Sequence, residues 1–131
     1  LHYPLRRQRQ MCIRDSTQAT APCPEVGDVE LWWAPGPAEP LQLDTATVMV
    51  EATHPENNPP TLTASEATDW QERPAFLFYE RWPGYRGGPA EAWVIRSDDG
   101  WLYVLRAQAI GEAHIPTLVR EVVETFGFTT N

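Results

Sequence analysis

The alternation of apolar and polar positions predicts strands along much of the chain. Residues 75–82 (AFLFYERW), 92–97 (AWVIRS) and 101–109 (WLYVLRAQA) are rich in aromatic and β-branched side chains, and turn-forming segments separate them. That composition is typical of strands bounded by turns. Residues 29–33 (VELWW) and 45–52 (TATVMVEA) share it. We therefore predict a strand in each of these segments.

The sequence DDG at 98–100, between the last two predicted strands, is the strongest turn signal in the chain. Asp-Gly favours a two-residue type I′ turn, in which both central residues take positive φ. Such a turn pairs Asp98 with Trp101 and, counting back, Val94 with Leu105. Both strands carry apolar side chains on both faces, which indicates a central place in a sheet that is covered on each side.

Residues 115–128 (IPTLVREVVETFGF) show the period of an amphipathic helix. Their apolar side chains recur at i, i+1, i+4, i+5 and i+8, which makes one stripe along a helix. Pro116 suits the first turn, and Gly127 suits a helix end in the left-handed conformation. The stripe consists of Leu118, Val119, Val122, Val123 and Phe126.

Residues 61–73 (TLTASEATDWQER) have no clear period. Thr63 or Ser65 fits the N-cap of a short helix, and Glu66 follows Thr63 at the spacing of a capping box, but the apolar face of such a helix is thin. The segments 35–40 and 53–60 contain several prolines and are predicted to be loops.

Together these elements predict an α+β fold in which an antiparallel sheet carries the C-terminal amphipathic helix on one face. We assign residues 29–131 to a single domain and residues 17–28, which are small, polar and proline-containing, to a linker.

Residues 1–16 (LHYPLRRQRQMCIRDS) differ from the rest in composition, since they hold four of the ten basic residues. Residues 6–15 resemble a translated sequencing adapter, because CGT CGG CAG CGT CAG ATG TGT ATA AGA GAC encodes them. We therefore expect residues 1–16 to be a non-native, disordered segment. We also expect the natural N-terminus, with any signal peptide, to be missing from this sequence.

The charge of the chain excludes one class of partner. Without residues 1–16, six arginines, no lysine and 17 acidic residues remain, a net charge of −11. Nucleic acid is then not an expected partner, because its binding depends on basic residues that neutralise phosphates. No apolar run reaches the roughly 20 residues of a membrane span. Cys23 has no partner cysteine in the natural part of the sequence.

The sequence holds no recognisable catalytic, cofactor or metal motif. His54 lies two residues before Glu56 and His114 two residues after Glu112, but a metal site needs three or four converging ligands. We therefore interpret both histidines as loop residues without a ligand role. No catalytic residue, metal site or cofactor is predicted, and the protein is not expected to be an enzyme.

The C-terminal half resembles one known family. The pieces that carry the resemblance are residues 100–105 (GWLYVL) and 122–126 (VVETF), within a strand, strand, turn, strand and helix order over about residues 73–128. This order is similar to the C-terminal half of the PsbP-like α/β/α sandwich. The resemblance implies an extracytoplasmic or lipoprotein-anchored domain, truncated at its N-terminus, that acts in protein interaction or assembly with an unknown protein partner.

One segment has the composition of a binding surface. Tyr79, Trp82, Tyr85 and Arg86 place three aromatic rings and one arginine around a Pro-Gly turn, and both kinds of side chain are enriched at interfaces. Exposed, they bind a protein, a small ligand or a carbohydrate; buried, they form the rim of the core. The interaction domain is the leading hypothesis for function, and a small-ligand or carbohydrate-binding domain that uses residues 79–86 is the alternative.

Overall fold

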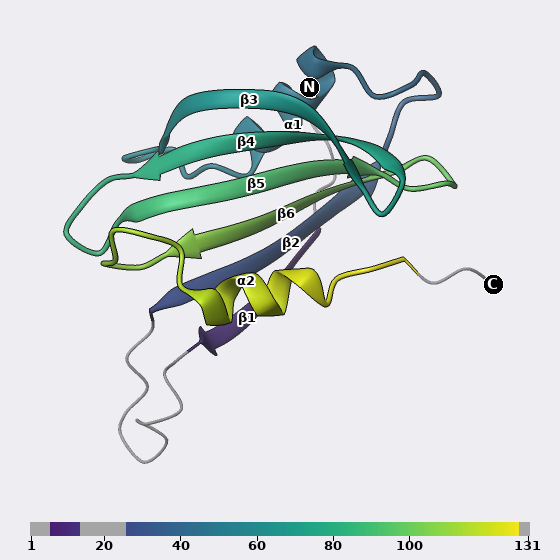
Figure 1. Ribbon diagram of the computed structural model, residues 1–131. Coiled ribbons are helices and arrows are strands. Elements are labelled where there is room, and N and C mark those ends of the chain that lie inside the picture. Colours follow the sequence, from purple (N-terminus) through teal and green to yellow (C-terminus); the bar gives the residue numbers. More distant parts are fainter. Residues whose placement is uncertain (1–5, 14–25, 129–131) are drawn as a thin grey trace.

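The computed structural model describes residues 6–13 and 26–128 (Figure 1). Its strands are β1 (Arg6–Ile13), β2 (Gly27–Pro35), β3 (Thr61–Trp70), β4 (Arg73–Trp82), β5 (Gly88–Arg96) and β6 (Trp101–Ala109), and its helices are α1 (Leu43–Ala52) and α2 (Thr117–Glu124). The strands form one antiparallel sheet of six strands in the order β1-β2-β6-β5-β4-β3. An antiparallel sheet with two helices is the α+β class that the sequence predicts.

The helices lie on opposite faces of the sheet (Figure 1). We call these the α1 face and the α2 face. Each has its own apolar core, and burying a large apolar side chain contributes roughly 1.5–3 kcal/mol. The α1-face core holds Ala34, Leu41, Ala46, Met49, Val50, Phe78, Ala92, Val94, Leu102 and Val104. The α2-face core holds Val29, Ala75, Ile95, Leu105, Ala107, Ala109, Ile115, Val119 and Val123.

Strands β5 and β6 lie in the middle of the sheet, as their apolar side chains on both faces predict. Val94 and Val104 belong to the α1-face core, whereas the neighbouring Ile95 and Leu105 belong to the α2-face core. Successive side chains of a strand point to opposite faces, so strands covered on both sides need apolar residues at nearly every position.

The register of this hairpin differs from the predicted one by one residue. Val94 pairs with Val104, and Arg96 pairs with Leu102. The Ser97 N–H donates to the Trp101 carbonyl at 2.9 Å, so the loop has three residues, and Gly100 has φ +91°. A three-residue hairpin loop with glycine in the left-handed conformation matches these values. The two-residue type I′ turn was therefore the wrong prediction.

Residues 45–52 form most of helix α1, not the predicted strand. The buried residues of α1 are Ala46, Met49 and Val50, at the i, i+3 and i+4 spacing of one helix face. In a strand Met49 and Val50 would point to opposite sides of the chain. The β-branched side chains indicated a strand, but burial of this apolar face against the sheet outweighs so weak a preference.

Residues 61–70 form strand β3. The short helix that the sequence allowed for this segment does not form. The strand is mostly exposed and lies at the edge of the sheet. It joins β4 through a two-residue turn in which Gln71 has φ +49° and Glu72 has φ +68°. Positive φ at both central positions defines the type I′ turn, here without the glycine or asparagine by which such a turn is recognised.

Helix α2 is shorter than the predicted 115–128. Pro116 has extended backbone angles, so the helix begins at Thr117. Val119 and Val123 are buried in the α2-face core, whereas Leu118 is exposed to 38%. The helix ends at Glu124, and the next residue, Thr125, has right-handed backbone angles. Gly127 is not in the left-handed region. The predicted glycine end is therefore wrong.

The structure describes only parts of the two N-terminal segments, residues 1–16 and the predicted linker 17–28. Arg6–Ile13, expected to be disordered, is strand β1 and pairs with β2 at the edge of the sheet. Backbone pairing can explain this, since an open strand edge accepts almost any extended segment. The rest of the predicted disordered segment, residues 1–5 and 14–16, lies outside the described residues, as do residues 17–25 of the predicted linker, which include Cys23. Residues 27 and 28 of that linker belong to β2.

We expect Gly27→Ala to destabilise the domain by about 1–3 kcal/mol, as overpacking does. A Cβ atom at Gly27 would lie 2.1 Å from Cγ2 of Val119 and 2.9 Å from the Gln108 carbonyl oxygen, so α2 would have to move away from β2. Urea unfolding measures the change.

The double variant Gly27→Ala/Val119→Ala tests this cause. Because Val119→Ala removes the clashing methyl group, the double variant should lose less stability than the sum of the two single variants. Strict additivity, or wild-type stability of Gly27→Ala, would contradict the close packing of α2 on Gly27.

Candidate functional site

The four residues singled out in the sequence do not form one surface. Tyr79 and Trp82 both lie in β4, but an odd and an even position of a regular strand point to opposite faces. Tyr79 lies on the α2 face and Trp82 on the α1 face. Tyr85 and Arg86 belong to the loop between β4 and β5.

Trp82 packs beside a buried ion pair. Its Nε1 donates to Glu80 at 3.2 Å, and the Arg106 guanidinium carbon lies 5.5 Å from the centre of a Trp82 ring. The His54 ring stands edge-on to Trp82 at 6.0 Å. Trp82 therefore covers this cluster. For this one residue, the contacts are those of a side chain at the rim of the core.

Arg106 and Glu80 form the ion pair, and both side chains are fully buried. Arg106 Nε donates to Glu80 Oε1 at 2.7 Å, and Nη2 donates to Glu80 Oε2 at 3.0 Å. Nη2 also donates to the Thr53 hydroxyl at 2.7 Å, and that hydroxyl donates to the Val50 carbonyl at 2.6 Å. The pair thus joins β4 and β6 to the C-terminal end of α1.

His54 completes this cluster, although the sequence indicated only a loop histidine. Its Nε2 lies 2.5 Å from Glu80 Oε2, and Nε2 carries the hydrogen because an ionised carboxylate only accepts hydrogen bonds. Burial opposes the ionisation of Glu80, but the hydrogen bonds from His54 and Arg106 outweigh it and lower the pKa of Glu80 to about 2. Glu80 is therefore ionised in the folded protein at neutral pH.

The sequence contains one signal for this cluster. Arg106 follows Leu102 and Val104 at the two-residue period of the α1 face, so it is a charged residue at a position predicted to be buried. Such a residue needs a buried partner. Nothing in the sequence identifies Glu80 or His54 as members of the cluster. Glu80 lies 26 residues before Arg106, and His54 lies a further 26 residues before Glu80.

A small hollow of about 290 Å³ lies beside this cluster, lined by Glu30, Trp32, Ala52, Thr53, His54, Pro55 and Trp82. Trp32 Nε1 donates to Glu30 at 2.8 Å, and Glu30 lies 3.8 Å from Arg106 Nη1. Most polar atoms of the cluster bond one another, but Arg106 Nη1 is buried without a hydrogen-bond acceptor in the described part of the chain and has only the longer ion pair with Glu30. We therefore assign the cluster a structural role, holding α1 against the sheet.

Tyr85 and Arg86 lie at one end of the sheet, where two loops meet. The Gly111 N–H donates to the carbonyls of Arg86 and Gly87 at 3.1 and 3.0 Å, so the β4–β5 loop is held against the loop that leads to α2. Tyr85 is exposed to 93%. An aromatic side chain is thus presented to solvent from a loop whose backbone is held in place.

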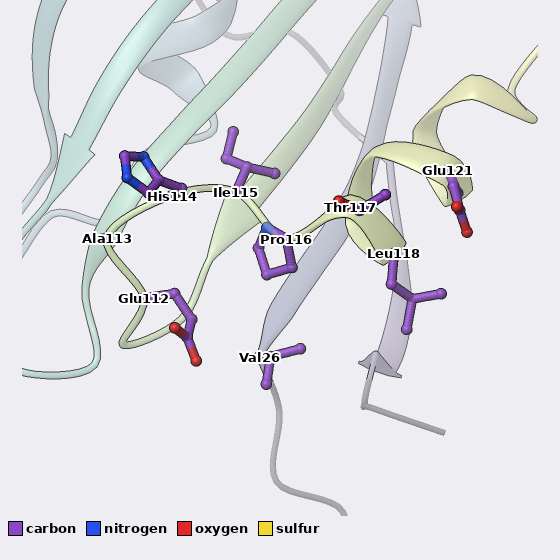
Figure 2. A pocket seen from close by; sticks show the side chains of 9 residues that line it. All are labelled: Val26, Glu112, Ala113, His114, Ile115, Pro116, Thr117, Leu118 and Glu121. Atoms are coloured by element: carbon purple, nitrogen blue, oxygen red, sulfur yellow. The ribbon is translucent and has the colours of Figure 1, made fainter. Parts of the chain in front are cut away.

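A hollow of about 700 Å³ lies on the loop that leads into α2 (Figure 2). Its apolar walls include Val26, Ile115, Pro116 and Leu118, and its polar side chains include Glu112, His114 and Glu121. We call Tyr85, Arg86 and this hollow the end surface. Figure 2 shows that the side chains of Glu112 and His114 point in different directions, so this acid and imidazole do not form a pair.

Two further observations concern the described residues only. Within residues 6–13 and 26–128, no group of three or more His, Cys, Asp or Glu side chains is placed to hold a metal ion. Neither of the two helices in this part of the chain is long and apolar enough to cross a membrane.

Comparison with known proteins assigns no family. A scan against protein-family models finds no match for this chain, and a search of curated proteins finds none either.

We predict that Glu80 makes stability depend on pH in the acid range. Its pKa in the folded protein is about 2, below the usual 4.5, so ionised Glu80 stabilises the fold above pH 4.5, and this contribution is lost as the pH falls toward 2. Such a shift corresponds to about 3 kcal/mol. The free energy of unfolding of Glu80→Gln should therefore be lower than that of the wild type near neutral pH, and the two should converge in acid.

Glu91→Gln is the matched control for Glu80→Gln. Glu91 also binds an arginine in a bidentate pair, since Arg120 Nη1 and Nη2 donate to it at 3.0 Å each, but the Arg120 side chain is 47% exposed. We expect Glu91→Gln to cost less than about 1 kcal/mol and Glu80→Gln about 3–5 kcal/mol, because the latter leaves a buried charge without its partner. Equal losses would contradict this assignment.

Proposed function

We propose that this domain is a non-enzymatic interaction or assembly module that binds a partner protein at its end surface. The observation that carries the proposal is Tyr85, exposed to 93% on a loop whose backbone is bonded to Gly111. Exposed tyrosines contribute large contact areas at interfaces at a small cost in side-chain entropy. Holding the loop in place before binding lowers that cost further.

The chemistry of the end surface favours a particular kind of partner segment. The hollow combines apolar walls with the carboxylates of Glu112 and Glu121, and the chain as a whole has a net charge of −8. A segment with a lysine or arginine next to an apolar side chain complements both features. Opposite charge also accelerates the encounter of the two proteins.

The order of elements supports the resemblance to the PsbP-like sandwich as part of this proposal. Strands β3 to β6 follow one another as neighbours in the sheet, α2 follows them, and α1 covers the other face. This is the layering that the resemblance leads us to expect. We extend the proposal to an extracytoplasmic location on that basis alone.

A carbohydrate site built from residues 79–86 is the weaker candidate. Its aromatic rings are separated by the sheet, since Tyr79 and Trp82 point to opposite faces and Tyr85 lies in the loop beyond them. The geometry therefore favours the protein-binding function for Tyr85 and Arg86, and a structural position for Trp82.

The test is a selection of peptides from a random library against the whole chain, followed by calorimetry. We expect selected peptides to carry a basic residue beside an apolar one. Tyr85→Ser should weaken their binding at least about tenfold, as the loss of an interface hot spot does. Glu112→Gln with Glu121→Gln should weaken it less and reduce its dependence on salt.

Leu43→Ser is the control, because Leu43 is also an exposed apolar side chain, at 44%, but lies at the start of α1. It should leave the Kd unchanged. Peptides that bind Tyr85→Ser as tightly as the wild type, or a selection that yields no binder, would overturn the proposal.

A further inference from the structure

The α2 face has a second recess, away from the end surface. Helix α2 packs against β2 and β6, which leaves the β3 to β5 side of this face next to the helix. A hollow of about 180 Å³ lies there, lined by Trp70, Trp93, Ala107, Arg120, Val123 and Glu124. We call it the tryptophan groove. It is smaller than the roughly 300 Å³ at which pockets for drug-sized ligands begin, so it suits a single ring.

Apolar and polar side chains are sorted into adjacent rows beside this groove. Leu77 pairs with Trp93, and in the next row of the same face Tyr79 pairs with Glu91. The Tyr79 hydroxyl donates to Glu66 Oε1 at 3.0 Å. Glu91 in turn accepts the two hydrogen bonds from Arg120. A polar row that runs from β3 to α2 therefore borders the aromatic wall.

The aromatic wall contains an unsatisfied donor. The rings of Trp70 and Trp93 meet edge to face at 5.2 Å. The Trp70 Nε1 is buried and has no hydrogen-bond acceptor in the described part of the chain. A buried N–H without an acceptor is unfavourable, and a ligand oxygen that accepts its hydrogen would remove that penalty.

The charges around the groove select the class of ligand. Glu66, Glu91 and Glu124 disfavour an anion, whereas the unpaired Trp70 N–H disfavours an ammonium group, which has hydrogens to donate but no atom to accept one. An uncharged ring with hydroxyl groups avoids both penalties. Its hydroxyls can accept from indole and guanidinium N–H groups and donate to carboxylates, while its C–H face packs on an aromatic ring.

We propose that the tryptophan groove binds one uncharged pyranose ring, packed on Trp93, with a ring hydroxyl accepting the Trp70 N–H. This site is separate from the protein-binding end surface and does not depend on it. It shares with the sequence-based carbohydrate hypothesis only Tyr79, which borders the groove.

The experiment titrates the full chain with the methyl pyranosides of glucose, galactose and mannose, observed by NMR of the indole N–H signals and by calorimetry. We expect at least one to bind with a Kd on the order of millimolar, as a small ligand with few contacts does, and to shift the Trp70 indole signal. The matched charged rings, methyl glucuronide and glucosamine, should bind more weakly than their neutral counterpart.

Two variants assign the binding to the groove. Trp93→Ala should weaken it at least about tenfold through the lost stacking surface. Trp70→Phe keeps an aromatic ring but removes the N–H, so it should weaken binding roughly three- to tenfold, the value of one hydrogen bond, without loss of stability. Trp101→Phe, at the start of β6 and not among the residues that line the groove, is the control and should bind as the wild type does.

Several results would overturn the proposal. These are no saturable binding of any of the three pyranosides to the folded chain, a charged ring that binds more tightly than the neutral one, or binding that Trp70→Phe and Trp93→Ala leave unchanged. None of these results bears on Tyr85, and a failure of peptide binding at the end surface does not affect the groove.

Discussion

The buried pair of Arg106 and Glu80 is the interaction on which the arrangement of α1 on the sheet depends. A guanidinium and a carboxylate removed from water need several hydrogen bonds to compensate their lost hydration. Here they are supplied from β4, from β6 and from the two residues that follow α1, Thr53 and His54. The end of the helix is thereby placed over one position of the central strands. Trp82 covers the pair and leads directly into the loop that presents Tyr85.

The two faces of the sheet consequently have different properties. On the α1 face, the polar groups of the Arg106 cluster bond one another with the exception of Arg106 Nη1, and a hollow of about 290 Å³ lies beside them. On the α2 face, the last helix is short and packs on β2 and β6, so the aromatic and polar rows of β3 to β5 remain beside it. The two binding surfaces that we propose, the tryptophan groove on the α2 face and the end surface, are therefore separate from the structural ion pair.

The errors made from the sequence share one physical cause. Residues 45–52 have the composition of a strand but bury Ala46, Met49 and Val50 as a helix face, and the β3–β4 turn places Gln71 and Glu72 at positive φ without glycine. The strand preference is worth about 1 kcal/mol, and left-handed backbone costs about 1–2 kcal/mol per residue. Packing of the helix face and pairing of the strands outweigh them. The loop at 98–100 differs from these two segments, because Asp-Gly is compatible both with a two-residue and with a three-residue loop. Strand pairing decides between the two loop lengths.

The sequence by itself determined the α+β class, the central place of the β5–β6 hairpin and, apart from the exposed Leu118, the apolar side of the last helix. These follow from periodicities of side chains that are near in sequence. Only the tertiary structure decided which distant residues meet. It brought His54 to Glu80 and Glu80 to Arg106, placed Trp70 beside Trp93, and sent Tyr79, Trp82 and Tyr85 to three different places. Such long-range contacts depend on the order and register of the strands, and no local sequence pattern encodes them.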